Sequence, residues 1–527
     1  MKTITLETWV DHGSIRPDEA VTVTAAVALK ARAPARTTRP PLRTVLALDV
    51  STSMRGTPLA HVVSSVERLL DALDEGDELG IVTFSDDARV LVPVRAVDAA
   101  GKREIRARVR ALRVESRTNI EAGLNAAARL LAEHTGRRSV LLLSDGAPNL
   151  GARTEEELRA VVRAHRPAIS FFALGYGTEH AEQILAAIGD AGGAGYEYVP
   201  DPLTCARAFA RALGAQGDAV ARGLELRIAP AEGVELVRFV GKEETRFGRG
   251  GVTVALPDLL GGAERFVAFE LRLRPGRDRF LAPLAELVVG GSAGSGGISE
   301  SCALSVEIAD RAPRMLPDAL RRILLVRADE ARDAARALAD RGQHGSAVAV
   351  LRSVLSAIEG VPGFVLDDGS PLAEAQALIV DEIMVFERRP APEAYAAFRK
   401  GTVGARLSSP VPSQARARGE ASQKLLEHVA GDLPDAWLLV DGRRHPLREE
   451  CIIGRTQSAD VQIANGMVSR RHAQIFANAG DFWVCDLGST NPTVVNGAAL
   501  RAAPHRLVPG DVIVVGEVAL RYEERRQ

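Results

Sequence analysis

The chain has 527 residues, enough for three or four domains that each bury a core of their own. Its formal net charge is −2 at pH 7, and this balance excludes a global acidic or basic field directed at nucleic acid or membranes. Hydrophobic residues make up 46% of the chain and aromatic residues only 4%, so Ala, Val and Leu must build most of the interior.

The N-terminal residues lack the apolar core of a signal peptide, and no uncharged apolar stretch approaches the length of a membrane span. We therefore expect a cytoplasmic protein without a membrane partner. Residues 4–29 alternate between apolar and polar, which is typical of strands, and we expect residues 1–40 to pair with strands later in the chain. The cysteines form no C-x-x-C pair and are expected to be reduced: Cys205, Cys302, Cys451 and Cys485.

Residues 41–215 alternate short apolar runs with segments of helical periodicity. This pattern predicts an α/β domain with a doubly wound parallel sheet, covered by helices on both faces. In such a sheet, ligands bind beyond the carboxyl ends of the strands. Helices are expected at 61–73 and 120–133, and strands at 45–49, 79–84, 90–94, 140–144 and 169–175.

Oxygen-bearing side chains follow two of these strands. Asp49-Val50-Ser51-Thr52-Ser53 comes directly after the first strand and supplies one carboxylate and two hydroxyls. Thr118 lies in a loop before a predicted helix, and Asp145 follows the strand at 140–144. Hard oxygen donors, with some coordination positions left to water, are the ligands that Mg²⁺ prefers.

This three-part set resembles the metal-ion-dependent adhesion site of von Willebrand factor A (VWA) domains, and every ligand position matches. The resemblance implies that Ser51, Ser53 and Thr118 ligate Mg²⁺ directly, with Mn²⁺ or Ca²⁺ as alternative ions. Asp49 and Asp145 would act mainly through water or as alternating inner ligands. An acidic residue of a partner protein would then complete the coordination shell.

Two other interpretations of this region stay open at this point. The serine hydroxyls could simply cap helix starts, without any metal. Catalysis at the site is a second alternative, but nothing in the sequence supplies a general base beside it. Arg117 stands where related domains often have glycine, and it could either assist an acidic ligand or compete with the cation.

Residues 216–312 alternate as strands of an antiparallel β-sandwich, which residues 1–40 would join, so that the VWA domain is inserted into a split sandwich. Residues 313–386 have helical periodicity, and we expect a helical hairpin that braces the structure or offers a small partner surface. The glycine-rich run at 290–297 lacks a following Lys-Ser/Thr pair and is therefore not a nucleotide-binding loop.

Residues 387–424 are rich in Pro, Ser, Ala and Arg, and eight basic residues against three acidic ones give a local net charge of +5. This composition predicts a solvated, basic, flexible linker, with a surface for an anionic partner as the alternative. Thr402 is the linker's single threonine, and we hypothesise that its phosphorylation creates a ligand for the neighbouring C-terminal domain.

Residues 425–527 contain short alternating strands separated by turn signals, which predicts an all-β sandwich. Four motifs occur in order, Gly454-Arg455, Ser469 to His472, Ser489-Thr490-Asn491 and Asn496-Gly497, and together they resemble a forkhead-associated (FHA) domain, a phosphothreonine-binding module. A guanidinium fork and loop hydroxyls suit a phosphate group. Alternatively, these loop residues are ordinary solvated turn formers. The residues expected at the phosphopeptide are Arg455, Ser469, Arg470, Thr490 and Asn491, and those with structural roles are Gly454, His472, Asn496 and Gly497.

Pro492 is the departure from the FHA pattern, because the family usually has glycine after the asparagine. Proline fixes φ and removes an N–H donor, so the geometry of the ligand loop is less certain than the fold.

These features together predict a cytoplasmic, non-enzymatic signalling scaffold of a bacterium. It would bind one partner through Mg²⁺ and another through phosphothreonine produced by a Ser/Thr kinase. The rival hypothesis is a regulatory or adaptor subunit of an AAA+ ATPase or chelatase-like machine. Any such ATPase would act in trans, since the sequence has no Walker motif.

Overall fold

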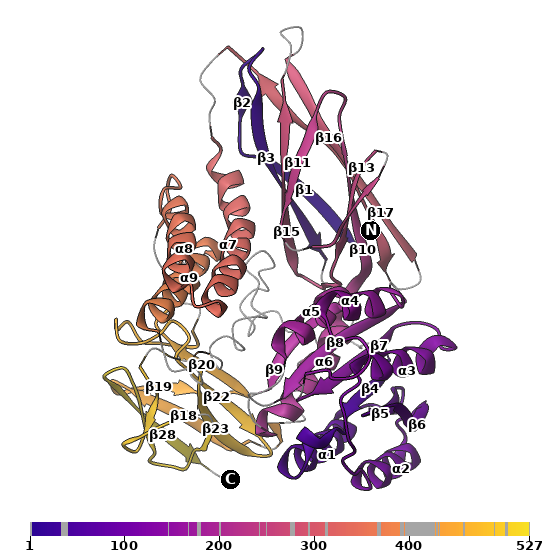
Figure 1. Cartoon of the computed structure of the whole chain (residues 1–527). Helices are drawn as coiled ribbons and strands as arrows, with labels where there is room; N and C mark the ends of the chain where they lie inside the picture. Colours follow the sequence, from indigo (N-terminus) through magenta and orange to yellow (C-terminus); the bar gives the residue numbers. More distant parts are fainter. Residues whose placement is uncertain are drawn as a thin grey trace. The chain divides into compact units, whose positions relative to one another are not determined.

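The computed structural model describes most of residues 3–525. The chain divides into two compact units, one built from residues within 1–34 and 220–391 and the other from residues within 35–219 and 418–527 (Figure 1). The residues that are not described between 3 and 525 are 33–40, 146, 167, 177–180, 200–201, 242, 249, 275–279, 294–295, 311–314, 366–369, 390–394, 396–426, 428–429, 432, 457–458, 488, 490 and 501–503.

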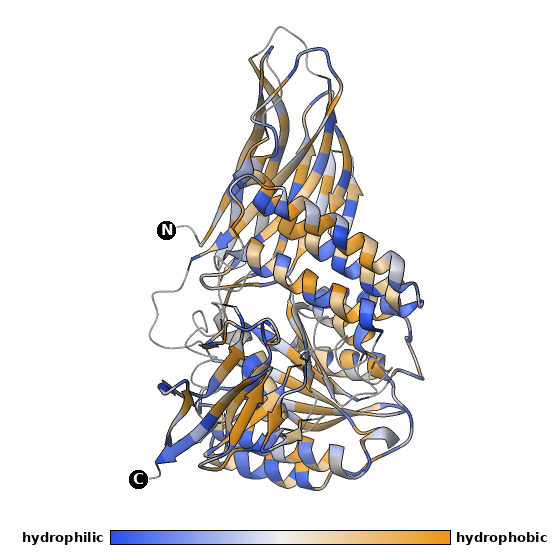
Figure 2. Ribbon diagram, turned by 90° about the vertical axis from the view of Figure 1, so that its left-hand side faces the viewer, coloured by the Kyte–Doolittle hydropathy of each residue, from blue (hydrophilic) through white to orange (hydrophobic). Residues whose placement is uncertain are grey.

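The first unit contains a β-sandwich whose strands come from both sides of the α/β domain in the sequence. The strands are β1 (Ile4–Val10), β2 (Ser14–Ile15), β3 (Val21–Ala31), β10 (Ala219–Pro230), β11 (Glu235–Val240), β12 (Thr245–Gly248), β13 (Gly251–Leu256), β14 (Leu259–Leu260), β15 (Glu264–Leu273), β16 (Leu281–Ala293) and β17 (Gly296–Ile308). One sheet has the order β1-β3-β15-β11, and the main path of the other is β12-β13-β10-β16-β17-β2. Apolar and polar residues alternate along these strands (Figure 2), and the buried ones form a shared core between the sheets.

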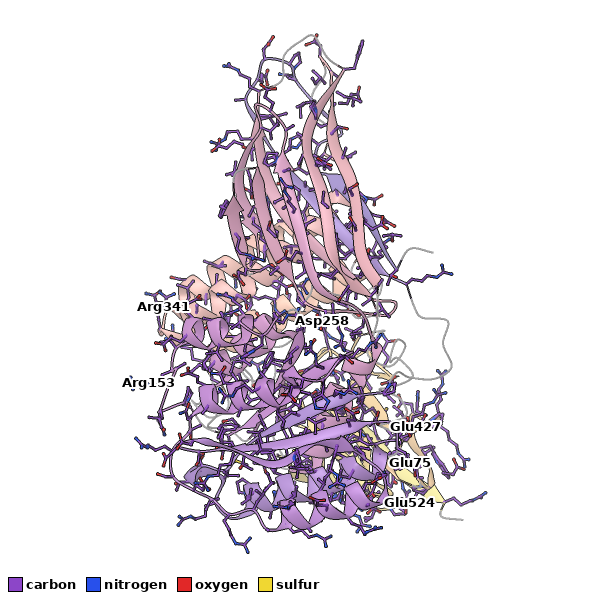
Figure 3. All side chains as sticks on the ribbon, turned by 90° about the vertical axis from the view of Figure 1, so that its right-hand side faces the viewer. Glu75, Arg153, Asp258, Arg341, Glu427 and Glu524 are labelled. Carbon is purple, nitrogen blue, oxygen red and sulfur yellow. The ribbon has the colours of Figure 1, made fainter. Side chains whose placement is uncertain are left out.

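Three helices follow the sandwich where the sequence predicts a hairpin: α7 (Pro317–Asp340), α8 (His344–Glu359) and α9 (Pro371–Arg388). All three pack against one another. The third helix starts at Pro371, and the Ser370 hydroxyl before it accepts a hydrogen bond from the Ala373 backbone N–H at 3.2 Å. At the C-terminal end of α7, Arg341 projects from the surface (Figure 3).

A cluster of buried charges joins α7 to α9. Oε1 of Glu382 on α9 accepts hydrogen bonds from Arg332, at 3.0 Å from its Nε, and from Arg336. All three residues are at most 3% exposed. The Coulomb attraction of Glu382 raises the pKa of Arg332 and favours its charged form against the effect of burial. Each arginine also pairs with an aspartate one turn earlier on α7, Arg332 with Asp329 and Arg336 with Asp333, both at 3.6 Å. Glu382 is thus the carboxylate that the two guanidinium groups share across the helices.

The second unit begins with the α/β domain. Its strands are β4 (Arg43–Asp49), β5 (Glu78–Phe84), β6 (Ala88–Ala96), β7 (Arg138–Ser144), β8 (Ile169–Tyr176) and β9 (Gly193–Val199). They form one sheet in the order β6-β5-β4-β7-β8-β9, parallel except for the antiparallel edge strand β6. This confirms the predicted doubly wound architecture, with one antiparallel strand added at the edge.

Helices cover both faces of this sheet, because alternate residues of the buried strands point to opposite sides. One core forms under α1, α2 and α6, and the other under α3, α4 and α5. The helices are α1 (Thr57–Ala72), α2 (Ala99–Arg110), α3 (Ile120–Ala132), α4 (Glu155–Arg163), α5 (Glu182–Gly192) and α6 (Pro202–Asp218), with a 3-10 turn η1 (Thr52–Met54) before α1.

The C-terminal domain of the second unit is an all-β sandwich, as the sequence predicts. Its strands are β18 (Asp435–Val440), β19 (Arg443–Pro446), β20 (Glu450–Gly454), β21 (Val461–Gln462), β22 (Ala473–Asn478), β23 (Asp481–Asp486), β24 (Val494–Val495), β25 (Ala498–Ala499), β26 (His505–Arg506), β27 (Val512–Val515) and β28 (Val518–Arg525). One sheet has the order β19-β18-β28-β27-β24-β25 and the other β21-β20-β22-β23-β26. Their apolar faces enclose one core.

Two further expectations concern membrane-spanning helices and the basic linker. In the part of the chain that the structure describes, none of the helices has both the length and the apolar character that a membrane crossing requires. The basic linker expected at 387–424 lies almost wholly outside the described residues, and so does Thr402.

Removing the carboxylate from the buried cluster tests its role in the helical segment. We expect Glu382→Ala to lower the local opening free energy of α7–α9 by about 3 kcal/mol or more, because two buried guanidinium groups lose their shared partner. Glu387→Ala, on the same helix, is the matched control, since its ion pair with Arg352 is exposed and should be worth less than about 1 kcal/mol. Native-state hydrogen exchange of the helix amides measures both values, and equal effects would contradict the assignment.

Candidate functional site

The predicted metal-binding residues lie at the carboxyl edge of the parallel sheet. The central strands β4 and β7 are neighbours in parallel register, with Leu48 opposite Leu143. Asp49 is the last residue of β4 and is fully buried, and Asp145 follows directly after β7. Their positions at the ends of adjacent parallel strands bring both residues to one edge of the sheet.

Hydrogen bonds connect four of the five predicted metal ligands into one network. The Ser51 backbone N–H donates to Oδ1 of Asp49 at 2.9 Å. The hydroxyls of Ser51 and Ser53 lie 3.0 Å apart, and Oγ of Ser53 donates to Oδ1 of Asp145 at 2.6 Å. Two carboxylates and two hydroxyls from different loops thus converge on a small region.

The loop that carries Thr118 lies against this network. The Thr52 backbone N–H donates to the Ser116 carbonyl at 3.1 Å, and the Thr52 hydroxyl donates to the same carbonyl at 2.8 Å. Thr118 itself is 4% exposed, and its backbone N–H donates to Oδ1 of Asn149 at 2.9 Å. The structure therefore brings the loop of the fifth predicted ligand beside the loop of the two serines.

The helix-capping interpretation does not describe these hydroxyls. Helix α1 begins after Gly56, and Ser51, at the start of η1, makes no side-chain capping hydrogen bond within the described structure. Helix α3 is capped by Asn119, whose side chain accepts from the Ala122 N–H at 3.1 Å, and not by Thr118. The hydroxyls of Ser51 and Ser53 instead bond to each other and to a carboxylate.

Burial dominates the electrostatics of Asp49 and raises the pKa of its carboxyl group to about 6. Hydrogen bonds from Ser144 and Ser51 lower this pKa, whereas the nearby negative charge of Asp145 raises it further. Ser144, whose hydroxyl donates to Oδ2 of Asp49 at 2.6 Å, is a residue that the sequence interpretation missed. The sequence feature that could have indicated Ser144 is its hydroxyl at the end of a strand, one residue before Asp145.

The donor set fits a hard divalent cation. The oxygen atoms of the network come from two carboxylates and neutral hydroxyls, as Mg²⁺ prefers. A group of three or more His, Cys, Asp or Glu side chains that could hold a metal is not found in the described part of the chain. Any cation here would therefore depend on Ser51, Ser53 and Thr118 as well as on Asp49 and Asp145. Arg117 forms an exposed ion pair with Asp86 at 2.8 Å.

A close backbone approach positions the first loop of the predicted phosphopeptide site. A Cβ atom on Gly454 would lie 1.8 Å from the Arg470 carbonyl oxygen, so no other residue fits at the end of β20. Directly after it, the Arg455 backbone N–H donates to the Ser469 carbonyl at 3.1 Å. Arg455 is half-buried, whereas Arg470 is only 6% exposed.

His472 positions the loop that carries Ser469. Its Nδ1 accepts a hydrogen bond from the Ser469 backbone N–H at 3.0 Å, and its backbone N–H donates to the Ile453 carbonyl at 2.8 Å. The ring is fully buried, and this burial lowers the pKa of the imidazole, which favours the neutral form. The contacts are those of a loop-positioning residue.

The loop after β23 is organised by Asp486, a residue that the sequence interpretation did not single out. Its carboxylate accepts from the backbone N–H and hydroxyl of Ser489, at 2.7 and 2.6 Å, and from the same groups of Thr493, at 2.8 and 2.6 Å. These bonds flank Pro492, so the missing N–H of the proline removes none of them. Nδ2 of Asn491 donates to the Met467 carbonyl at 2.8 Å and thereby links this loop to the one that carries Ser469.

Two of the remaining predicted residues form a turn, and one lies outside the described structure. Asn496 and Gly497 have φ values of +50° and +83° and connect β24 to β25, and the Asn496 amide bonds to Asp511 at 2.7 Å. The left-handed backbone at both positions is the geometry that Asn-Gly pairs favour. Thr490 falls outside the described residues.

Comparison with protein families and known proteins agrees with this division of the second unit. The family model for the von Willebrand factor type A domain matches residues 44–202, and the model for the FHA domain matches residues 451–516. The uncharacterized protein YfbK of Escherichia coli is 30% identical over 162 residues, which are 29% of this chain and 28% of that protein. The FHA domain-containing protein FhaA of Mycobacterium tuberculosis is 42% identical over 76 residues, 14% of each chain.

A solved structure shares the fold over a longer part of the chain. The von Willebrand factor type A protein from Catenulispora acidiphila aligns with 80% of this chain and 95% of its own, with a TM-score of 0.53 and 15% identity. By contrast, the chain covers only 28% of the E. coli protein and 14% of the M. tuberculosis protein, much less than two thirds of either. The chain contains a VWA domain, which the family model matches over residues 44–202, and a C-terminal FHA domain, matched over residues 451–516.

Proposed function

We propose that the chain is a non-enzymatic signalling scaffold that binds one protein through a divalent cation and another through phosphothreonine. The observation that carries this proposal is the continuous network of Asp49, Ser51, Ser53 and Asp145 at the carboxyl edge of the sheet. Such a network presents several hard oxygen atoms at one point, next to the loop of Thr118. The proposal places the protein in the cytoplasm of a bacterium that uses Ser/Thr kinases.

At the VWA edge, the hydroxyls of Ser51, Ser53 and Thr118 would hold Mg²⁺ directly, with Mn²⁺ or Ca²⁺ as alternatives. Asp49 and Asp145 would balance its charge, mainly through water. The bound ion would supply a Lewis-acidic position to which a carboxylate of the partner protein can bind. The buried charge of Asp49 supports this assignment, because a cation beside it offsets the unfavourable effect of burial.

At the FHA loops, the Arg455 guanidinium would bind the phosphate through paired N–H groups, with the Ser469 hydroxyl as a neutral donor. The backbone bond between these two residues supports the assignment, because it fixes them side by side. Arg470, Thr490 and Asn491 remain the further residues proposed at the phosphopeptide. Asn491 also joins the two loops through Met467, so its proposed contact with the ligand backbone accompanies a role in loop structure.

The metal site can be tested through stability, independently of any partner. Above pH 6 the metal-free protein holds Asp49 ionised, at a cost of roughly 3 kcal/mol relative to an unfolded-state pKa of 3.8. The folded-state pKa is raised, so this cost is absent below about pH 4 and is complete above about pH 6. We expect Mg²⁺ to raise the thermal transition of the native VWA domain at pH 7.5 and to leave that of Asp49→Asn unchanged.

Without metal, the stability of Asp49→Asn relative to the native chain should increase between pH 4 and 6 and then stay constant. Calorimetry in chelator across this range measures the difference. A Mg²⁺ shift that persists in the asparagine variant would remove the metal site from the proposal.

The phosphopeptide site can be tested with a phosphothreonine peptide library on the full chain. We expect selective binding that requires the phosphate, and at least about a tenfold loss of affinity in Arg455→Ala, since charge-assisted hydrogen bonds are worth about 1.5–3 kcal/mol. Arg506→Ala is the matched control, because this arginine of the same domain is exposed and pairs with Asp481. Equal affinities of the two variants would argue against Arg455 as the phosphate ligand.

A further inference from the structure

A buried arginine connects the VWA and FHA domains within the second compact unit. Arg207, on α6 of the VWA domain, is only 1% exposed, although an arginine on the outer layer of an α/β domain is normally solvated. In the described structure, every hydrogen bond of its side chain ends on the FHA domain. Nη1 donates to the carbonyls of Ala477 at 2.8 Å and Glu449 at 3.1 Å, and Nη2 bonds to the Glu450 carboxylate.

The contact combines a charge, two carbonyl dipoles and an aromatic face. The Arg207 guanidinium carbon lies 5.4 Å from the centre of the Phe476 ring, within the range of a cation–π interaction. Burial lowers the pKa of Arg207 to about 9, so the side chain still carries its charge at neutral pH. A buried guanidinium needs such a set of partners, because leaving it unpaired would be very costly.

Two neighbouring arginines of the VWA domain extend the contact. Arg211 lies one helical turn after Arg207 on the same side of α6, and its Nη1 donates to Oε1 of Glu450 at 2.9 Å. Its Nε donates to Glu197 on β9 at 2.8 Å, which fixes its direction. Arg68 on α1 donates to Oδ1 of Asn478. The packed helices α1 and α6 of the VWA domain thus both contact the same end of one sheet of the FHA domain.

The register of the FHA sheet shows which end this is. Glu450 pairs with Phe476, and Ile453 pairs with Ala473, so the ladder between β20 and β22 has two distinct ends. Residues 449–450 and 476–478 form the end that the arginines contact. The opposite end is formed by the end of β20 and the start of β22. Arg455 directly follows β20 there, and Ser469 lies shortly before β22. The contact therefore lies about one strand length from the loops of the proposed phosphopeptide site.

On the VWA side, the contact is also remote from the metal network. Helix α1 starts after the loop of Ser51 and Ser53, and Arg68 stands eleven residues along it from Thr57. At 1.5 Å per residue this is about 16 Å along the helix axis. We infer that α1 and α6 form an intramolecular docking surface for the β20–β22 end of the FHA domain, which the Arg207 contact holds while both binding edges stay open.

Hydrogen exchange of the full-length protein tests this docking directly. We expect Arg207→Ala to speed the exchange of amides in residues 476–482 at least tenfold. Arg110→Ala is the matched control, because it removes an arginine of the same helical layer whose partner, Glu67, lies within the VWA domain. It should leave exchange in residues 476–482 unchanged. Unchanged exchange in Arg207→Ala would overturn the inference.

A double-variant cycle separates a direct contact from general destabilisation. Glu450→Gln should speed exchange in the same segment, and adding it to Arg207→Ala should produce less than the product of the two separate effects, since both remove one interaction. Independent, multiplicative effects would show that the residues do not act together. Protection that increases with protein concentration would place the docking between two molecules and overturn the intramolecular assignment.

Whether the docked state leaves the phosphopeptide loops accessible can be measured separately, through peptide affinity. If docking leaves the phosphopeptide loops free, native protein and Arg207→Ala should bind a phosphothreonine peptide selected on the native chain with affinities within about twofold. A gain of tenfold or more in the variant would show that the docked state covers the loops. This part rests on the proposed phosphothreonine function, whereas the exchange experiments do not and would stand if that function failed.

Discussion

The arrangement of the VWA edge depends on one constraint, a carboxylate that is fully removed from solvent at the end of the central strand. Asp49 ends β4 between the ends of β5 and β7, so no water-filled side is left for its charge. Its oxygen atoms must therefore take their partners from the protein, and they do so from Ser51 and Ser144. The same loop is tied to its neighbours by backbone bonds, from Val50 to Phe84 at 3.0 Å and from Glu115 to Val50 at 2.6 Å. The strand end that carries this buried charge is thus also tied to the end of β5 and to the loop of Glu115.

The FHA loops are arranged around the opposite sign of charge. The residues that position these loops from the interior are uncharged. Gly454 allows the close approach of the Arg470 backbone, and the neutral imidazole of His472 accepts a hydrogen bond from Ser469. The guanidinium of Arg455 remains half-buried in front of them. Asp486 adds a negative charge, but its four hydrogen bonds to Ser489 and Thr493 occupy it within its own loop. One site therefore holds negative charge suited to a cation, and the other presents positive charge suited to an anion.

The sequence was sufficient for the fold class, because the apolar runs of the α/β domain and the alternation of both sandwiches follow the periodicities of their secondary structure. The positions of Asp49 and Asp145 at one edge follow from the same reasoning, since parallel strands end together. The roles of Ser144 and Asp486 did not follow, because each depends on hydrogen bonds that only the folded loops create. Arg117 could be given two opposite roles from sequence, and the structure pairs it with Asp86, 31 residues away, which no local pattern indicates.

Arg207 shows the same limit more strongly, since its partners lie more than 240 residues further along the chain. In a helix with polar and apolar residues, an arginine indicates a solvated face, and periodicity carries no information about a domain that covers it. The docked arrangement also changes how the two proposed binding sites can cooperate. For tethered domains, the effective concentration of one site at the other is set by the length of the linker. When the FHA domain is held on α1 and α6, the spacing between the metal edge and the Arg455 loop is set by the packed domains instead. A partner that carries an acidic residue and a phosphothreonine then gains affinity from both sites only if its own geometry matches that spacing.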